Sequence, residues 1–192
     1  MQAGAALGRH LANVAAEQPE SVEASVVRAD LPATKLMEED ICRHDRYFRL
    51  EGKDAVQVDL NRLPVLDWYQ VAVAGGGTGG APAGISAARA GARTVVFEAL
   101  YGLGGVGTEG RIARYYHGNR CGFTTEIDHG TAALAPEPDF GPDAGEWNSE
   151  WKKQWLLKAA REAGAEIWFG SFCTAAARRG DRVCGMLVST PW

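Results

Sequence analysis

A glycine-rich turn between two short apolar runs constrains the fold of this chain more than any other feature. Residues 69–74, which read YQVAVA, form an apolar run long enough for one buried strand. Gly75, Gly77 and Gly80 follow in the spacing G-x-G-x-x-G, and a helical stretch begins there. In this spacing the first glycine permits a tight turn and the second lets the backbone approach a pyrophosphate. The third lets the helix pack close to the strand.

The residues after the turn extend this pattern into a dinucleotide-binding unit. The predicted helix would point its free N–H groups and the positive end of its dipole at the phosphates. Residues 93–97 form the next apolar run, and Glu98 ends it, 18 residues beyond Gly80. A carboxylate there can accept hydroxyl protons of an adenosine ribose, and it would repel the 2′-phosphate of NADP. The alternative is a flexible glycine loop between ordinary elements, and the fingerprint alone does not separate FAD from NAD.

A second glycine-rich stretch follows directly. Residues 102–110, GLGGVGTEG, hold five glycines in nine positions, with Gly104 and Gly105 adjacent. Glycines let a backbone run close to a bound cofactor without side-chain clash. The alternative is a mobile surface loop. The position immediately after the predicted ribose-binding strand favours contact with the cofactor, and it argues against an NAD-dependent dehydrogenase.

Residues 111–130 carry a high density of hydrogen-bonding groups. Within them, His117 could transfer a proton near neutral pH. Arg114 could hold an anionic substrate or an anionic reduced cofactor. A polar helix end and turn is the alternative, and the residues leave both interpretations open. The other polar members of this stretch include Arg111, Tyr115, Tyr116, Asn119, Arg120, Cys121, Asp128 and His129.

The pattern after this stretch predicts a second crossover. Residues 131–146, rich in Pro, Gly, Ala and Asp, are expected to have no regular structure. A helix capped by Asn148 or Ser149 should run to Ala163, with its tryptophan stripe in the core. A strand over 165–169 then completes a β-α-β unit. Finally, residues 172–177 and 182–188 flank a short glycine turn and predict a β-hairpin.

Composition excludes several other classes of protein. The chain has 192 residues, 46% of them hydrophobic and 23% charged, and a net charge of −4. Nothing in this balance suggests nucleic-acid binding, and no apolar run reaches the length of a membrane helix. No signal peptide is evident. The four cysteines have neither zinc-site, iron–sulfur nor disulfide-framework spacing, so we expect no metal and free thiols in a reducing, cytoplasmic compartment.

The sequence thus predicts two parts. Residues 1–66 form an N-terminal extension with a short helix and a possible hairpin over 47–60. Residues 67–192 form an α/β domain with a Rossmann-like parallel sheet and a β-hairpin.

Residues 71–128 resemble the FAD-dependent oxidoreductases of the two-dinucleotide-binding flavoprotein group. The resemblance covers about residues 63–190 and is strongest to the branch related to the flavin subunit of heterodisulfide reductase. It implies that FAD is the cofactor and that the function is hydride or electron transfer. It also implies that the cofactor's pyrophosphate lies against the first glycines, Gly75, Gly77 and Gly80, and its adenosine ribose against Glu98. By the same resemblance, Gly104 and Gly105 would pass near the pyrophosphate and ribityl chain, and residues 111–118 would approach the flavin ring.

The chain departs from this family most clearly at its end. The family's hairpin is part of a three-stranded meander, and a substrate domain and a further FAD-contacting segment come after it. We therefore expect this chain to correspond to the front part of a longer flavoprotein that acts on a small-molecule substrate. Either a partner chain or oligomer completes the fold, or the chain is a truncated product, or the isolated chain is marginally stable. The alternative is a non-catalytic FAD-binding module that needs a partner.

Overall fold

The computed structural model describes residues 63–136, 141, 143–179 and 182–191. The helix and hairpin predicted within the N-terminal extension lie outside these residues. Contacts between Cα atoms divide the chain into two units. Of the described residues, the larger unit contains 67–136, 141, 143–175 and 186–191, and the smaller contains 63–66, 176–179 and 182–185.

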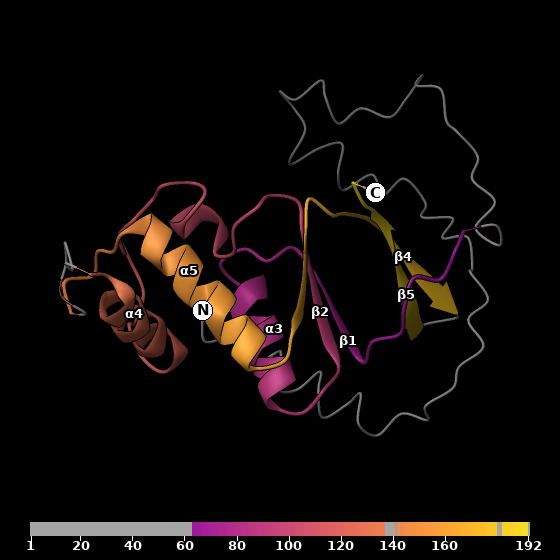
Figure 1. Cartoon of the computed structure of the whole chain (residues 1–192), viewed down its shortest axis with the longest axis horizontal. Coiled ribbons are helices and arrows are strands. Elements are labelled where there is room, and N and C mark those ends of the chain that lie inside the picture. Colours follow the sequence, from indigo (N-terminus) through magenta and orange to yellow (C-terminus); the bar gives the residue numbers. More distant parts are fainter. Residues whose placement is uncertain (1–62, 137–140, 142, 180–181, 192) are drawn as a thin grey trace, which may run out of the picture. The chain divides into compact units, whose positions relative to one another are not determined.

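The larger unit is built on a parallel sheet of three strands (Figure 1). Strands β1 (Val71–Ala74), β2 (Thr94–Glu98) and β3 (Glu166–Phe169) lie in the order β1-β2-β3. In the register, Val73 pairs with Val96 and Val96 with Ile167. The central strand β2 is buried along its whole length, as expected of an apolar strand between two parallel neighbours.

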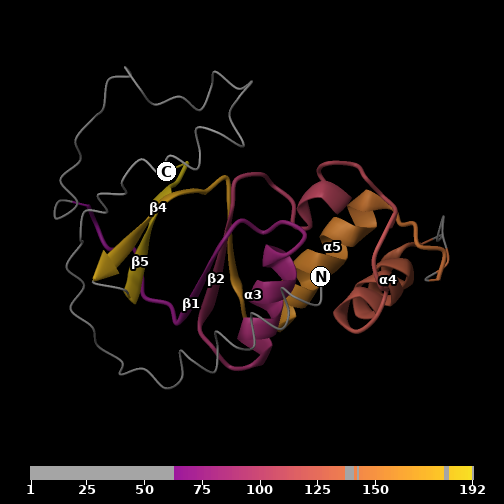
Figure 2. The same ribbon diagram turned by 180° about the vertical axis from the view of Figure 1, so that it is seen from behind.

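Two crossover helices cover one face of this sheet (Figures 1 and 2). Helix α3 (Gly80–Arg89) joins β1 to β2, and helix α5 (Ser149–Glu162) leads into β3. Both crossovers step in the same direction along the sheet, and right-handed crossovers therefore place both helices on the same side. Helix α4 (Phe123–Leu134) packs against α5 as an outer layer.

The core lies between the sheet and these helices. Trp155, Leu156 and Ala159 of α5 pack there with Ile85 of α3 and Ile127 of α4. The prediction that the tryptophan stripe serves packing is confirmed for Trp155, which is buried. The remaining buried members of the cluster are Ala81, Ala88, Val96, Leu103, Ala160 and Ala165.

The start of α5 is fixed by a side-chain cap. The Asn148 side-chain oxygen accepts hydrogen bonds from the backbone N–H groups of Glu150, at 2.9 Å, and Trp151, at 3.4 Å. These donors would otherwise lack partners within the helix. The predicted cap and helix are therefore confirmed, and Gly164 follows the helix with a φ of +83°.

The expectation of irregular structure from residue 131 onward is wrong at its beginning. Helix α4 continues through Thr131 to Leu134. Thr131 lies one turn after Ile127, and both are buried against the rest of the unit. Burial of this helical face outweighs the weak helix preference of the local sequence, which contains Gly130 and three threonines.

The C-terminal hairpin agrees with its prediction. Strands β4 (Phe172–Arg179) and β5 (Arg182–Ser189) form a separate two-stranded sheet. Thr174 Oγ1 donates to the backbone oxygen of Leu187 at 3.4 Å. With the parallel sheet, the two crossover helices and this hairpin, the α/β class with a Rossmann-like sheet is confirmed.

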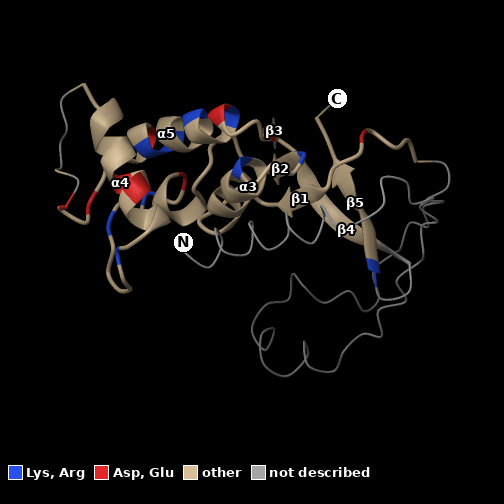
Figure 3. Ribbon diagram, turned by 90° about the horizontal axis from the view of Figure 1, so that it is seen from below, with Lys and Arg blue, Asp and Glu red and all other residues tan. Residues whose placement is uncertain are grey.

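Charges of both signs are distributed over the described helices (Figure 3). On α5, Lys158 pairs with Glu162 at 2.7 Å, and on the neighbouring layers Arg89 of α3 pairs with Glu126 of α4 at 2.7 Å. Among the described helices, none has the length and apolar character needed to cross a membrane.

The contact between α3 and β2 leads to a first prediction. A Cβ added at Gly84 would lie 2.4 Å from Val96 Cγ2. Gly84→Ala should therefore lower the free energy of unfolding by about 2 kcal/mol, and Val96→Ala, which empties that space, by a similar amount. Because Val96→Ala makes room for the methyl group of Gly84→Ala, the double variant should be at least about 1 kcal/mol more stable than the sum of the two single effects predicts. Urea unfolding measures this coupling, and strictly additive effects would contradict the tight contact.

Candidate functional site

The two glycine loops meet at the carboxyl ends of β1 and β2. The backbone N–H of Gly104 donates to the oxygen of Gly76 at 2.9 Å, and Thr78 Oγ1 donates to the oxygen of Gly104 at 3.1 Å. A Cβ on Gly105 would lie 2.9 Å from Gly77 Cα, so the two backbones are in direct contact. Gly104 adopts a φ of +105°, which favours glycine. This edge of a parallel sheet is where ligands of such folds bind.

The first turn of α3 presents free backbone donors beside this contact. A Cβ on Gly80 would lie only 1.8 Å from the oxygen of Gly75, so the helix starts in close contact with the turn. Gly79 occupies the cap position, and no side chain caps the helix. Within the described residues, the backbone N–H groups of residues 77–80 donate to no protein acceptor. An open helix N-terminus of this kind can bind an anion.

Glu98 links the first glycine loop to the segment that leads into the second loop. Its Oε2 accepts the backbone N–H of Gly76 at 2.7 Å, and its Oε1 accepts that of Leu100 at 2.8 Å. The residue is buried at the end of β2. Each carboxylate oxygen has a second lone pair, so it can still accept a hydrogen bond from a hydroxyl group. The structure therefore adds a scaffolding role to the ribose contact that the sequence predicts.

A pocket of about 140 Å³ opens beside the glycine loops. Thr78 and Pro82, at the start of α3, and Gly104 form one part of its lining. The charged residues in the lining are Lys152 and Arg114, and no carboxylate lines the pocket. The other lining residues are Val106, Gly107, Ile112, Tyr115, Trp147 and Leu156.

Two aromatic rings surround the ammonium group of Lys152. Its Nζ lies 3.3 Å from the centroid of the Trp147 ring and 5.3 Å from that of Tyr115. The two rings pack against each other with centroids 4.6 Å apart. Trp147 Nε1 donates to the oxygen of Gly107 at 2.6 Å, in the short helix η3 (Gly105–Gly107). The second glycine loop is thus tied to the start of α5 through Trp147.

Burial changes the acidity of two groups in this pocket. It lowers the pKa of Lys152 to about 8, and the negative charge of Asp128 partly opposes this change. Burial also raises the pKa of Tyr115, and Asp128 raises it further. The Tyr115 hydroxyl donates to Asp128 Oδ1 at 2.9 Å, while Asp128 Oδ2 lies 3.5 Å from Arg120 Nε.

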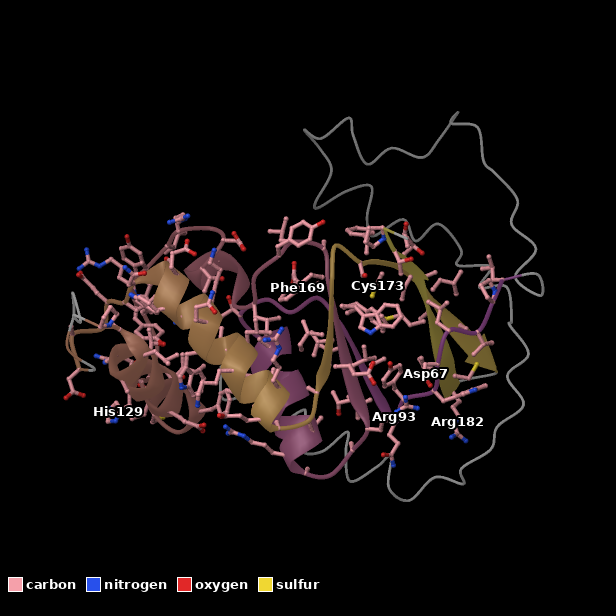
Figure 4. The ribbon with its side chains drawn as sticks, in the orientation of Figure 1. Asp67, Arg93, His129, Phe169, Cys173 and Arg182 are labelled. Carbon is pink, nitrogen blue, oxygen red and sulfur yellow. The ribbon has the colours of Figure 1, made fainter. Side chains whose placement is uncertain are left out.

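The structure separates the two predicted catalytic residues. Arg114 lines the pocket, and its guanidinium pairs with Glu146 at 2.5 Å. His117 is exposed and does not line the pocket. His129 is also exposed, on α4 (Figure 4). Arg111 pairs with Glu150 at 3.0 Å. Of these four residues of the polar stretch, Arg114 alone belongs to the pocket lining.

Sequence reasoning missed Lys152 and Trp147. A signal for Lys152 was available, because it lies three residues before Trp155 and four before Leu156, on the buried stripe of α5. A lysine on an apolar stripe is unusual and calls for a reason. Trp147 precedes the helix and carries no periodic signal.

The described residues contain no group of three or more His, Cys, Asp or Glu side chains arranged to hold a metal ion. Cys42 lies outside the described residues.

Comparisons with known proteins point to one family. A family model for FAD dependent oxidoreductases matches residues 70–191. None of the curated proteins is similar to the chain. Among solved structures, THI4 of Thermovibrio ammonificans is similar, with 20% identity and a TM-score of 0.45 over 62% of this chain and 46% of that one.

Two further solved structures are similar in the same region. A geranylgeranyl bacteriochlorophyll reductase-like protein from Thermoplasma acidophilum has 22% identity and a TM-score of 0.44, over 64% of this chain and 35% of that one. The OxyS anhydrotetracycline hydroxylase from Streptomyces rimosus has 23% identity and a TM-score of 0.44, over 64% and 28%. The chain thus spans less than half the length of each of these three solved structures.

Proposed function

Because the chain belongs to the FAD dependent oxidoreductase family, we propose that its two glycine loops hold FAD for an oxidation–reduction reaction. FAD is the cofactor of this family. When bound, it supplies hydride or electron transfer at its flavin ring, while the protein supplies position and electrostatics.

The contact between the two glycine loops carries this proposal. Side chains at Gly80 or Gly105 would collide with neighbouring backbone, and the N–H groups of residues 77–80 remain available. A bare backbone surface at a helix N-terminus suits a pyrophosphate. The residues present therefore fit an ADP-containing cofactor, and the second loop, which an NAD site does not need, favours FAD over NAD.

Within this proposal, each predicted residue has a role of its own. Gly75, Gly77 and Gly80 bind the pyrophosphate, and Glu98 accepts the adenosine ribose hydroxyls. The remaining proposed residues are Gly104 and Gly105, near the ribityl chain, Arg114, which supplies positive charge in the pocket, and His117, which exchanges a proton with solvent.

We also propose that the protein belongs to the branch related to heterodisulfide reductase and that it is located in the cytoplasm. We propose further that it acts on a small-molecule substrate and that a partner chain or oligomer completes it. A module that binds FAD without turning over a donor is the second candidate. Bound FAD that no electron donor reduces, in the protein alone, would favour that module.

The nature of the cofactor is tested by releasing it. We expect protein purified after supplementation with FAD to carry nearly one FAD per chain, because the two loops bind the whole dinucleotide. Heat denaturation followed by chromatography of the released nucleotide measures this, with protein supplemented with NAD as the control. Release of NAD, with no FAD retained, would overturn the proposal.

A further inference from the structure

Lys152 is a buried residue without a counterion in the described part of the chain. The residue is only 3% exposed, although lysine is rarely buried unless paired. Within the described residues, no carboxylate forms an ion pair with it and no acceptor receives its hydrogen bonds. Its recorded partners are the rings of Trp147 and Tyr115. Asp128 acts on it through space, as the direction of its effect on the Lys152 pKa indicates.

Two aromatic rings do not fully replace the solvent that this cation has lost. Burial of an ammonium group disfavours its charged form, and cation–π contacts offset only part of that cost. The balance is visible in the pKa of Lys152, which burial lowers to about 8. A negatively charged ligand would supply the missing interaction.

The position of Lys152 identifies the chemistry of that ligand. It shares a pocket with Thr78, which precedes α3, with Pro82 in the first turn of α3, and with Gly104 of the second loop. The open N–H groups of residues 77–80 lie just before this helix and at its first residue. Helix N-termini and lysine side chains both favour phosphate oxygens. No carboxylate lines the pocket that would repel them.

We propose that Lys152 binds the diphosphate of the dinucleotide, as a second anchor opposite the glycine turn. This inference rests on the proposed function. Trp147 and Tyr115 hold the ammonium group in place, so little side-chain entropy is lost when the phosphate binds. Arg114 lines the same pocket, but its guanidinium is already paired with Glu146.

Phosphate binding by this amine predicts a dependence on pH. The free protein loses the Lys152 proton as the pH rises through about 8. A bound phosphate favours the protonated amine, so binding above this pH requires uptake of a proton. Affinity should therefore fall above pH 8, by up to about tenfold per pH unit. The charged or titratable neighbours of Lys152 are Asp128 on α4 and Tyr115 and Arg114 in the lining.

The test uses ADP-ribose, which keeps the diphosphate but lacks the flavin ring, together with FAD. Lys152→Met should weaken binding of both by at least about tenfold, because it removes a charge-assisted hydrogen bond. Lys152→Arg should restore most of the affinity and remove the pH dependence above pH 8. Lys158→Met, on the exposed face of the same helix, is the control and should change nothing. Calorimetric titration measures each affinity, and circular dichroism checks that each variant is folded.

The outcomes separate this inference from the function on which it rests. Wild-type protein that binds neither ligand would refute the proposed function itself. Wild-type binding that Lys152→Met leaves unchanged would refute the role of Lys152 alone. Loss of FAD binding with unchanged ADP-ribose binding would place the amine at the flavin end and also overturn the inference. Should Lys152→Met not fold, a wild-type ADP-ribose affinity that is constant from pH 7 to 9.5 would still overturn it.

Discussion

Gly80→Ala is expected to lower the free energy of unfolding by about 3 kcal/mol and to abolish measurable FAD binding. The added Cβ would lie 1.8 Å from the backbone oxygen of Gly75. A backbone oxygen cannot move aside as the end of a flexible side chain can. The helix must therefore move away from the turn, which opens the contact between α3 and β1. The N–H groups that we propose bind the pyrophosphate move with it. Urea unfolding and titration with FAD measure the two effects.

Gly79→Ala is the matched control for this prediction. Gly79 has a φ of −94°, and nothing lies within 4 Å of an added Cβ. Alanine there should be neutral or stabilise the protein by about 0.5 kcal/mol, since it restricts the unfolded chain. Equal effects of the two substitutions would mean that the close approach at Gly80 does not matter.

Glu98→Ala is expected to have the other large effect. Alanine would remove the acceptor of the buried N–H group of Gly76 and that of the N–H group of Leu100, a residue on the surface. An unsatisfied buried donor costs about 1–3 kcal/mol, whereas water can satisfy the Leu100 N–H, so we expect a loss of about 2 kcal/mol in stability. FAD affinity should fall at least about 100-fold, because both the loop geometry and the proposed ribose contact are lost. The same unfolding and titration experiments apply.

Two control substitutions accompany the prediction for Glu98→Ala. Glu98→Gln keeps one carbonyl acceptor of the same shape and should lose about half as much stability. Glu162→Ala removes an exposed carboxylate on α5 that pairs with Lys158, and should cost less than about 0.5 kcal/mol. If Glu98→Ala unfolded at the same urea concentration as Glu162→Ala, the stabilising role of the two Glu98 hydrogen bonds would be disproved.

The dinucleotide unit could be read from the sequence because its constraints are local. Gly80 is needed where the start of α3 meets the backbone oxygen of Gly75, and Gly75 itself has a φ of +90°, which favours glycine. The Asn148 cap and the apolar stripe of α5 are local signals of the same kind. In each case a short segment carries its own physical reason.

Helix α4 illustrates what local patterns do not contain. Gly130 lies inside it, although glycine weakens a helix by about 1 kcal/mol. A Cβ there would lie 1.8 Å from Trp155 Nε1, so the glycine makes room for a tryptophan 25 residues later in the chain. That requirement becomes visible only when α4 and α5 are packed together, and the sequence alone therefore predicted no regular structure from residue 131 onward.

The charged pocket was hidden for the same reason. Arg114 was predicted as a site residue, but its companion Lys152 comes from α5, and Trp147 from the segment before that helix. Their proximity depends on the return of the chain to the glycine loops after α4. His117, in contrast, was predicted from its residue type, and the structure places it at an exposed position.

Fluorescence titration of FAD with the wild-type protein tests the central claim most directly. Binding of FAD at the two glycine loops should change the flavin emission until one FAD is bound per chain. Adding ADP-ribose should then displace the flavin, because both ligands use the same loops. Flavin emission that stays constant in the presence of folded protein would contradict the claim that these two loops form an FAD site.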